Sequence, residues 1–288
     1  MIIDSHTHAW RVWPYATASV PDPSTRGSID HILFDLDRHG IDRAVVLAAC
    51  VDHNPDNDAY VLEGAARHPD RLVAFPDVDS VWSDTYHRPG AAARLRARCE
   101  SVSTAGIGHF LDEANDGWLT SEDADAWFRE VRAQRLVMSI AAGPAWFEDI
   151  GRVAAHHPDV PLLLHHVGMI RHVDATAEGD VQALVALAIH PNIGVKASGF
   201  YAGSDETAEY PYPAQMTLFR RVYEAFGPRR VTWGSDHPVA AWEGCSLPQA
   251  RDVVRRHAPF IRSDDLSLVM GGTIATLLEE RRFPAAQG

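Results

Sequence analysis

Apolar runs of strand length alternate with helical patterns from one end of the chain to the other, and this alternation constrains the fold more than any other feature. Strands that alternate with helices are typical of an α/β protein with a parallel sheet. Eight strands are predicted, at residues 2–8, 44–49, 72–76, 105–111, 136–141, 161–166, 193–198 and 231–236. The length of 288 residues is somewhat above the roughly 250 of a typical (β/α)8 barrel. We therefore expect residues 1–288 to form one closed barrel of the TIM type, as a single domain.

Amphipathic helical patterns occupy the segments between the predicted strands. The first helix has a suitable N-cap in Ser28, one apolar face and a stop at Gly40. Further helices are expected near residues 58–67, 90–100, 122–134, 147–156, 181–189, 215–226, 248–258 and 274–281. No linker or low-complexity tract divides this pattern, which favours one barrel over two domains.

The charge and the apolar runs exclude two classes of partner. The formal net charge is −13 and the sequence has no run rich in Lys and Arg, which argues against binding to nucleic acid. No apolar run approaches the roughly 18 residues that span a bilayer, and the N-terminus lacks a basic segment followed by an apolar one. We expect a cytoplasmic protein with a small-molecule substrate, and an assembly of identical chains stays open. Cys50, Cys99 and Cys245 are widely spaced, and we expect them to be reduced packing residues.

Two histidines lie one residue apart at the end of the first predicted strand, in Asp4-Ser5-His6-Thr7-His8. Side chains at positions i and i+2 of a strand point to the same face, so His6 and His8 should project together. Two neighbouring imidazoles are able to hold one metal ion. The alternative is a coincidental pair with a packing role.

Other polar residues follow the carboxyl ends of predicted strands, where barrel enzymes carry their active sites. His109 lies near the end of the fourth strand, His165 and His166 end the sixth, Lys196 lies in the seventh, and Asp236 ends the eighth. Imidazoles and a carboxylate around one mouth are ligands that zinc favours, and a bound zinc lowers the pKa of water to about 7. Asp236 is then placed to act as a base. Of His165 and His166, we expect only one to face inward, because neighbours in a strand point to opposite faces.

For three of these residues, a structural role is the alternative to a role at an active site. His109 is either a substrate contact or an interior histidine with its hydrogen bonds satisfied. Lys196 is either a substrate contact or a structural ion-pair partner. Asp236 is alternatively an N-cap for the segment that follows it.

The loops after the first, second and seventh strands should determine specificity. They are residues 9–27, 51–57 and 200–214. The candidates for substrate contact are Trp10, Trp13 and Tyr15 in the first loop and Tyr201 in the third, with ordinary loop packing as the alternative. The acidic residues Asp205, Glu206 and Glu209 in the third loop would suit a neutral or hydroxylated substrate better than an anionic one.

Six motifs, taken in order, resemble the amidohydrolase superfamily. They are Asp4-Ser5-His6-Thr7-His8, Asn57-Asp58-Ala59-Tyr60 with His68-Pro69-Asp70-Arg71, His165-His166-Val167-Gly168, Val195-Lys196-Ala197-Ser198-Gly199, Phe226-Gly227-Pro228-Arg229-Arg230 and Trp233-Gly234-Ser235-Asp236-His237-Pro238. The resemblance covers almost the whole chain and is closest to the amidohydrolase-related branch, which contains sugar lactonases and the 2-pyrone-4,6-dicarboxylate lactonase. It implies a distorted (β/α)8 barrel in which His6, His8, His166 and Asp236 surround the substrate, with the aspartate handling protons for the attacking water.

The chain departs from the family pattern in three places. The fifth predicted strand has no histidine, whereas metal-dependent members often have one there. The further histidine is His166 on the sixth strand, as in the lactonase-like branch, where some members work without a bound metal. The fourth strand has Gly108 and His109 where lactonases for anionic substrates tend to carry an arginine, which makes a dicarboxylate substrate less expected. Thr273 stands where the family usually has asparagine, a change that nothing in the sequence explains.

These observations predict a metal-assisted hydrolase of a small cyclic ester or a related carbonyl compound. One divalent metal ion, zinc or alternatively manganese, would be held by His6, His8, His166 and Asp236, and a metal-free mechanism stays open. Asp236 would deprotonate water and then protonate the leaving alkoxide, while His166 completes the metal site or binds the oxyanion. The alternatives are a non-oxidative decarboxylase or hydratase on the same barrel and, more remotely, a non-catalytic barrel that serves as a binding protein.

Overall fold

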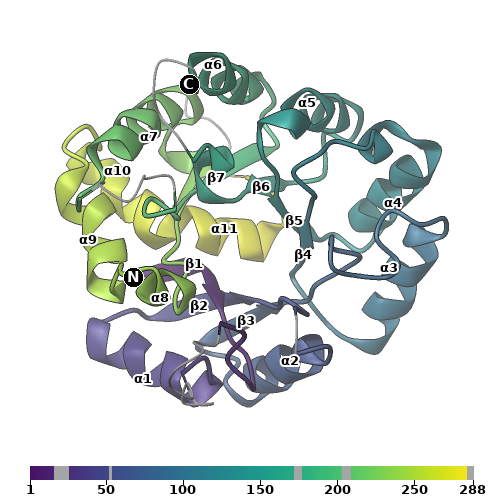
Figure 1. The fold of residues 1–288 in the computed structure, drawn as a ribbon, viewed down its shortest axis with the longest axis horizontal. Coiled ribbons are helices and arrows are strands. Elements are labelled where there is room, and N and C mark those ends of the chain that lie inside the picture. Colours follow the sequence, from purple (N-terminus) through teal and green to yellow (C-terminus); the bar gives the residue numbers. More distant parts are fainter. Residues whose placement is uncertain (16–25, 52–53, 172–176, 203–208, 284–288) are drawn as a thin grey trace.

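The computed structural model describes residues 1–15, 26–51, 54–171, 177–202 and 209–283. Eight parallel strands surround a common axis, and helices lie outside them (Figure 1). The strands are β1 (Ile3–His8), β2 (Arg43–Leu47), β3 (Leu72–Phe75), β4 (Gly106–Phe110), β5 (Val137–Ala141), β6 (Leu162–Leu164), β7 (Ile193–Ala197) and β8 (Val231–Trp233). All eight predicted strands are confirmed.

The strands pair in chain order, and the ring has two short seams. One sheet has the order β1-β2-β3 and the other the order β4-β5-β6-β7-β8. Isolated bridges between Thr7 and His237 and between Asp77 and Gly108 connect the two sheets. The backbone N–H of His8 donates to the carbonyl of His237 over 2.9 Å, and that of Gly108 to the carbonyl of Pro76 over 2.8 Å. The predicted barrel is therefore confirmed, and it is distorted at these seams.

Helices cover the outside of the ring. They are α1 (Ile29–His39), α2 (Asn57–Arg67), α3 (Ala91–Ser101), α4 (Glu122–Ala133), α5 (Phe147–His156), α6 (Glu178–Ala186), α7 (Pro213–Phe226), α8 (Val239–Trp242), α9 (Leu247–His257), α10 (Ser263–Ser267) and α11 (Thr273–Glu280). The predicted start and stop of α1 are confirmed, since the Ser28 side chain accepts a hydrogen bond from the N–H of His31 and Gly40 has a φ of 67°. Helices α8 and α10 were not predicted, and both are too short to show a helical period.

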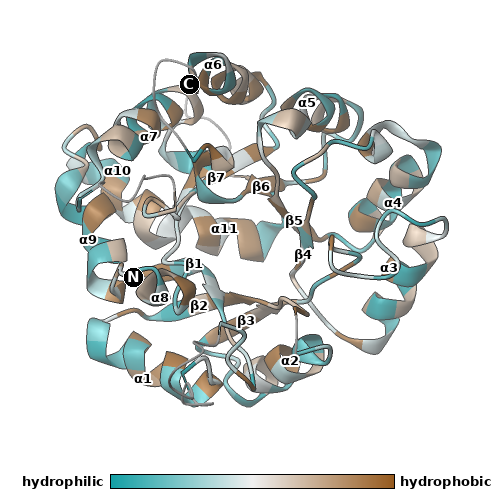
Figure 2. Ribbon diagram, in the orientation of Figure 1, coloured by the Kyte–Doolittle hydropathy of each residue, from teal (hydrophilic) through white to brown (hydrophobic). Residues whose placement is uncertain are grey.

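The apolar residues fill two regions, inside the ring and between the ring and the helices. Helices α1, α4 and α7 turn apolar side chains toward the strands, and their outward faces are polar (Figure 2). Helix α11 closes the end of the ring at which the strands begin (Figure 1), where its Ile274 and Leu277 pack with Ile3, Phe75 and other interior residues. The opposite end, at the carboxyl ends of the strands, is left for polar side chains.

Two expectations based on composition are consistent with this arrangement. Among the described residues, no helix is both long and apolar enough to cross a membrane. Cys50, Cys99 and Cys245 are free, and Cys245 is buried.

Candidate active site

Three side chains from the two ends of the strand order meet at the carboxyl end of the barrel. The Nε2 atoms of His6 and His8 are 3.2 Å apart, and each lies 3.3 Å from Oδ1 of Asp236. All three side chains are buried. The structure thus brings together the histidine pair and the carboxylate that the sequence placed 228 residues apart.

The contact between β1 and the segment after β8 explains this meeting. The carboxylate of Asp4 accepts hydrogen bonds from the backbone N–H of Ser235, over 2.8 Å, and from the Ser235 hydroxyl. A side chain at Gly234 would clash, because a Cβ there would lie 2.6 Å from Cβ of His6. Asp236 then turns back with a φ of 59°. The local sequence Gly-Ser-Asp therefore ties the two strands together and directs the Asp236 carboxylate toward the histidines.

The second ring nitrogen of each histidine has its own partner. The Nδ1 of His8 lies 2.9 Å from the carbonyl oxygen of Leu47. Because a carbonyl only accepts, this Nδ1 carries the proton and donates it, and Nε2 of the neutral ring is left with a lone pair. The Nδ1 of His6 lies 2.9 Å from Nζ of Lys196, which donates to Oγ of Ser139 over 2.7 Å. Burial lowers the pKa of the Lys196 ammonium well below its usual value.

His165 and His166 both approach this cluster. Their rings lie 4.5 and 4.6 Å from the ring of His6, measured between centroids. The expectation that only one of them faces inward was wrong, because β6 ends at Leu164 and His166 has a φ of 46°. The alternation of side chains applies only to extended backbone. Nδ1 of His166 lies 3.0 Å from the hydroxyl of Ser198, and its Nε2 lies 3.7 Å from Oδ2 of Asp236.

The surroundings favour the ionised form of Asp236 and the neutral forms of His6, His166 and Tyr201. Burial by itself raises the pKa of Asp236, but the neighbouring imidazoles, above all His166 and then His6, hold this pKa well below its usual value. Burial lowers the pKa of His6 and of His166. Tyr201 donates a hydrogen bond to Oδ2 of Asp236, and burial and the carboxylate raise the pKa of this phenol well above its usual value. Burial thus disfavours the charged forms of Tyr201, His6 and His166 beside this carboxylate.

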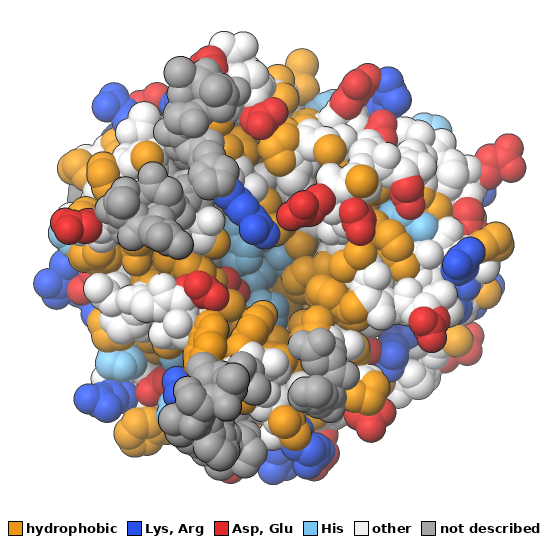
Figure 3. Space-filling view, in the orientation of Figure 1, with side chains coloured by type: hydrophobic (Ala, Val, Ile, Leu, Met, Phe, Trp, Pro, Cys, Tyr) orange, Lys and Arg blue, Asp and Glu red, His pale blue; other side chains and the backbone are white. Residues whose placement is uncertain are grey.

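A cavity of about 350 Å³ opens above these residues. Its lining includes His8, His166, Tyr201 and Asp236, together with Trp10, Tyr15, Trp82, Phe110 and Arg171. Figure 3 shows the hollow at the centre of this face, with histidines at its floor, hydrophobic side chains along its sides and a basic side chain at its edge. The volume is within the range of sites for small molecules.

Three predicted substrate contacts lie away from the cavity lining. His109 is buried on the helix side of β4, where its Nδ1 bonds to the carbonyl of Val78 over 2.8 Å and its ring packs against Trp127. Lys196 lies beneath the site, behind His6. Trp13 lies behind Trp10 in an aromatic cluster, so the first loop lines the cavity through other residues. Parts of the loops expected to set specificity, including Asp205 and Glu206, lie outside the described residues.

Sequence reasoning missed four of the residues that build the site. Phe110 follows His109 in β4, and the alternation of that strand turns the aromatic ring, rather than the imidazole, toward the interior. Ser139 lies inside the barrel and bonds to Nε2 of His165 over 2.8 Å. Trp82 and Arg171 come from segments after β3 and β6. These segments lie outside the strands, so no alternation of side chains indicates which residues face the cavity.

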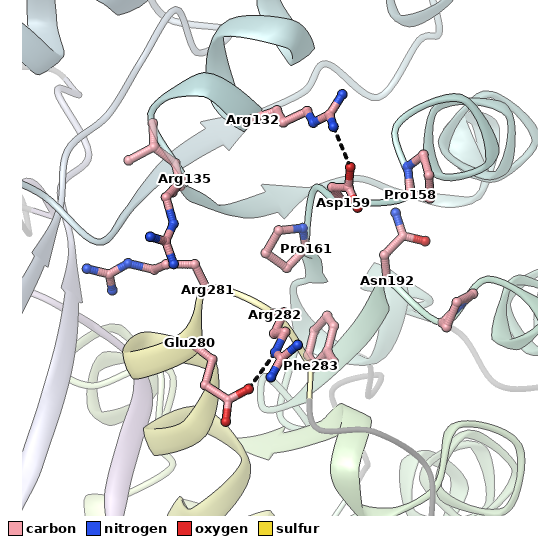
Figure 4. Close-up of a pocket in the computed structure, with 12 residues that line it drawn as sticks. Arg132, Arg135, Pro158, Asp159, Pro161, Asn192, Glu280, Arg281, Arg282 and Phe283 are labelled. Atoms are coloured by element: carbon pink, nitrogen blue, oxygen red, sulfur yellow. Dashed lines mark hydrogen bonds and ion pairs between the residues drawn. The ribbon is translucent and has the colours of Figure 1, made fainter.

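A second cavity, of about 470 Å³, lies at the opposite end of the barrel between the starts of β5 to β7 and the end of α11 (Figure 4). It is larger than the first, but its charged side chains largely pair with one another. Arg132 lies 2.8 Å from Asp159, and Arg282 lies 2.6 Å from Glu280. Its described lining has no histidine or cysteine, so we place the active site at the smaller cavity.

Two groups at the site could hold a metal ion. One is formed by His6, His8 and Asp236, and the other by His6, His165 and His166. Two residues of the first group, His8 and Asp236, line the cavity, and its three ligand atoms are 3.2–3.3 Å apart. A third group on the helices, Asp125 with His156 and His157, is partly exposed.

Comparison with known proteins extends these observations. A model of the amidohydrolase family matches residues 3–278. A protein of Burkholderia ambifaria named L-fucono-1,5-lactonase is 25% identical over 258 residues, which cover 84% of this chain and 82% of that protein.

Two solved structures share the fold. An amidohydrolase from Burkholderia multivorans with bound zinc has a TM-score of 0.75 at 21% identity, over 99% of this chain and 100% of that one. A probable 2-pyrone-4,6-dicarboxylic acid hydrolase from Acinetobacter baumannii, with citric acid bound, has a TM-score of 0.72 at 18% identity, over 96% of this chain and 99% of that one. At these identities the likeness concerns the fold alone.

Proposed function

We propose that this chain, which belongs to the amidohydrolase family as its motifs predicted, hydrolyses a small cyclic ester. The observation that carries the proposal is the position of one carboxylate, Asp236, between the pair formed by His6 and His8 and the cavity. The relative named as a lactonase supports the reaction class. The histidine pair supports participation of a metal.

The donor set fits a zinc ion. Ligands 2.0–2.1 Å from a tetrahedral zinc are about 3.3–3.4 Å apart, and the three ligand atoms of His6, His8 and Asp236 are 3.2–3.3 Å apart. The hydrogen bond to Leu47 leaves Nε2 of His8 with the lone pair that a metal ligand needs. A neutral His8 in this tautomer has no Nε2 proton to donate, so direct binding of the substrate carbonyl by His8 is less favourable. Bound there, zinc would polarise the carbonyl and lower the pKa of water, and manganese suits the same ligands less well.

The residues of the chain then divide the proton transfers. Asp236 accepts a proton as the oxygen of water adds to the carbonyl carbon. It returns this proton to the ring oxygen as the carbon–oxygen bond breaks, so that a hydroxy acid is formed. We assign to His166 the tautomer in which Nδ1 accepts a hydrogen bond from Ser198 and Nε2–H donates one to the developing oxyanion. Tyr201 holds Oδ2 of Asp236 in place.

The test measures the hydrolysis of a panel of lactones through the proton that each hydroxy acid product releases. The Asp236→Asn variant should lose activity by about 100- to 10,000-fold, the usual contribution of a positioned acid–base group. Near-wild-type turnover in this variant would refute the proposed role of Asp236. The metal is tested separately, by plasma mass spectrometry on protein prepared without a histidine tag. We expect about one zinc per chain, as the three ligand atoms predict, and its loss in a His6→Ala/His8→Ala variant.

A decarboxylase or hydratase would use the same barrel, and product analysis separates it from a lactonase. Release of carbon dioxide from an aromatic acid without lactone hydrolysis would favour the decarboxylase. A non-catalytic barrel would have no use for an ionised carboxylate beside the histidine pair. The position of Asp236 therefore argues against this alternative.

A further inference from the structure

The walls of the cavity are poor hydrogen-bonding surfaces. Trp10 and Trp82 both line it, but their indole N–H groups donate elsewhere, to the carbonyl of Ala49 over 2.9 Å and to Oδ2 of Asp77 over 2.5 Å. Phe110 packs against Trp82, with ring centroids 4.7 Å apart, and continues the same wall. These rings therefore offer the ligand carbon surface, and a hydroxyl group placed against them would lose its hydrogen bonds to water without replacement.

One fixed positive charge faces this apolar cavity. Among the described lining residues, Arg171 is the only arginine or lysine, and Asp236 is the only carboxylate. Arg171 follows the left-handed turn that presents His166, and its charge contributes to the lowered pKa of that imidazole. A guanidinium can bind a carboxylate through two parallel hydrogen bonds. Arg171 is thus the described lining residue that can bind an anionic group of the ligand.

We propose that the substrate is a lactone with a planar, apolar body and one carboxylate, which Arg171 binds while the ring lies against Trp10, Trp82 and Phe110. This inference rests on the proposed function and specifies its substrate class. It differs from the neutral or hydroxylated substrate that the acidic residues of the third loop suggested. Of those, Glu209 is exposed and is not part of the lining.

The experiment compares three zinc-supplemented reactions of the whole protein. The substrates are a neutral benzo-fused lactone, the same lactone with one carboxylate, and a polyhydroxylated sugar lactone. We expect the carboxylated lactone to have the highest kcat/KM, by roughly 10-fold or more over the neutral one, from one charge-assisted contact. Arg171→Gln should abolish this preference mainly through KM, so that kcat/KM falls roughly 10-fold or more further for the carboxylated lactone than for the neutral one. Arg171→Lys should retain part of the preference, because it keeps the charge but loses the planar guanidinium.

The matched control is Arg132→Gln, which removes an exposed arginine at the other end of the barrel and should change none of these values. A sugar lactone that reacts faster than both aromatic lactones would overturn the inference and leave the lactonase function standing. If wild type hydrolyses none of the three, the lactonase proposal fails, and calorimetric titration with benzoate then tests the part of the inference that does not depend on it, the binding of a carboxylate by Arg171. Binding of benzoate that disappears in Arg171→Gln would support it, whereas absence of binding to wild type would overturn it.

Discussion

Gly234 provides a direct test of how the site is assembled, because it lies where β8 approaches β1. A Cβ at this position would be 2.6 Å from Cβ of His6, whereas an ordinary contact is at least 3.4 Å. Gly234→Ala therefore requires the two strands to separate by about 0.8 Å, the difference between these distances. The overpacking should lower the free energy of unfolding by about 1–3 kcal/mol.

The same displacement acts on the metal ligands. Asp236 is two residues from Gly234, and its Oδ1 lies 3.3 Å from each Nε2 atom of His6 and His8. Separation of the strands would increase these distances to about 4 Å, beyond the roughly 3.4 Å of a tetrahedral zinc site. We expect Gly234→Ala to lose most of its zinc and to lower kcat/KM for its best lactone by about 100-fold.

Urea denaturation, zinc content and lactone hydrolysis should be measured together on this variant. The control is Gly179→Ala, because Gly179 is exposed in α6 and a Cβ there meets no atom within 4 Å. This control should be as stable as wild type or about 0.5–1 kcal/mol more stable, with full zinc content. If Gly234→Ala retains wild-type stability, zinc and turnover, the close approach of the strands does not position Asp236 and the argument is refuted.

Three further perturbations test other parts of the structure. Tyr201→Phe removes the donor to Asp236, so the pKa of this carboxylate should rise and the acidic limb of the kcat/KM profile should move to higher pH. Burial raises the pKa of Asp58 from 3.8 to about 6. Between about pH 4 and pH 6 the folded state therefore holds a proton that the unfolded state has released, so the free energy of unfolding falls as the pH rises through this range. Urea unfolding across this range should show a smaller fall for Asp58→Asn. Trp127→Ala should lower the free energy of unfolding by about 3–5 kcal/mol, since the ring is fully buried, and an unchanged urea midpoint would contradict this.

The barrel could be predicted from the sequence because its signals are local and repeated. Each β/α unit has an apolar run, a helix with an apolar face and, in the case of α1, caps at Ser28 and Gly40 that the structure contains. The histidine pair of β1 was predictable for the same reason, since a strand with period two turns His6 and His8 to one face. Asp236 was predictable as a polar residue after the last apolar run.

The rest of the site depends on backbone that leaves the strand conformation. β6 and β8 end two and three residues before the predicted ends, at Leu164 and Trp233, and the chain turns before it presents His166 and Asp236. Arg171 lies beyond such a turn, so neither its distance along the chain nor a hydrophobic period indicated that it faces the cavity. In β4 the prediction chose the wrong side chain. His109 was selected for its chemistry, whereas the alternation of the strand turns its neighbour Phe110 inward.

The positions of these turns connect the stability of the barrel with its chemistry. Of nine non-glycine residues with positive φ in the described part of the chain, four lie at the site: His166, Val167, Met169 and Asp236. Each such residue costs on the order of 1–3 kcal/mol, and a β-branched residue such as Val167 is among the least suited to this conformation. An extended chain would place His165 and His166 on opposite faces of β6, and only a left-handed turn brings both imidazoles to the same cluster. The apolar interior and α11 stabilise the ring at the other end of the strands, and the carboxyl ends can therefore retain the backbone strain that assembles the histidines around Asp236.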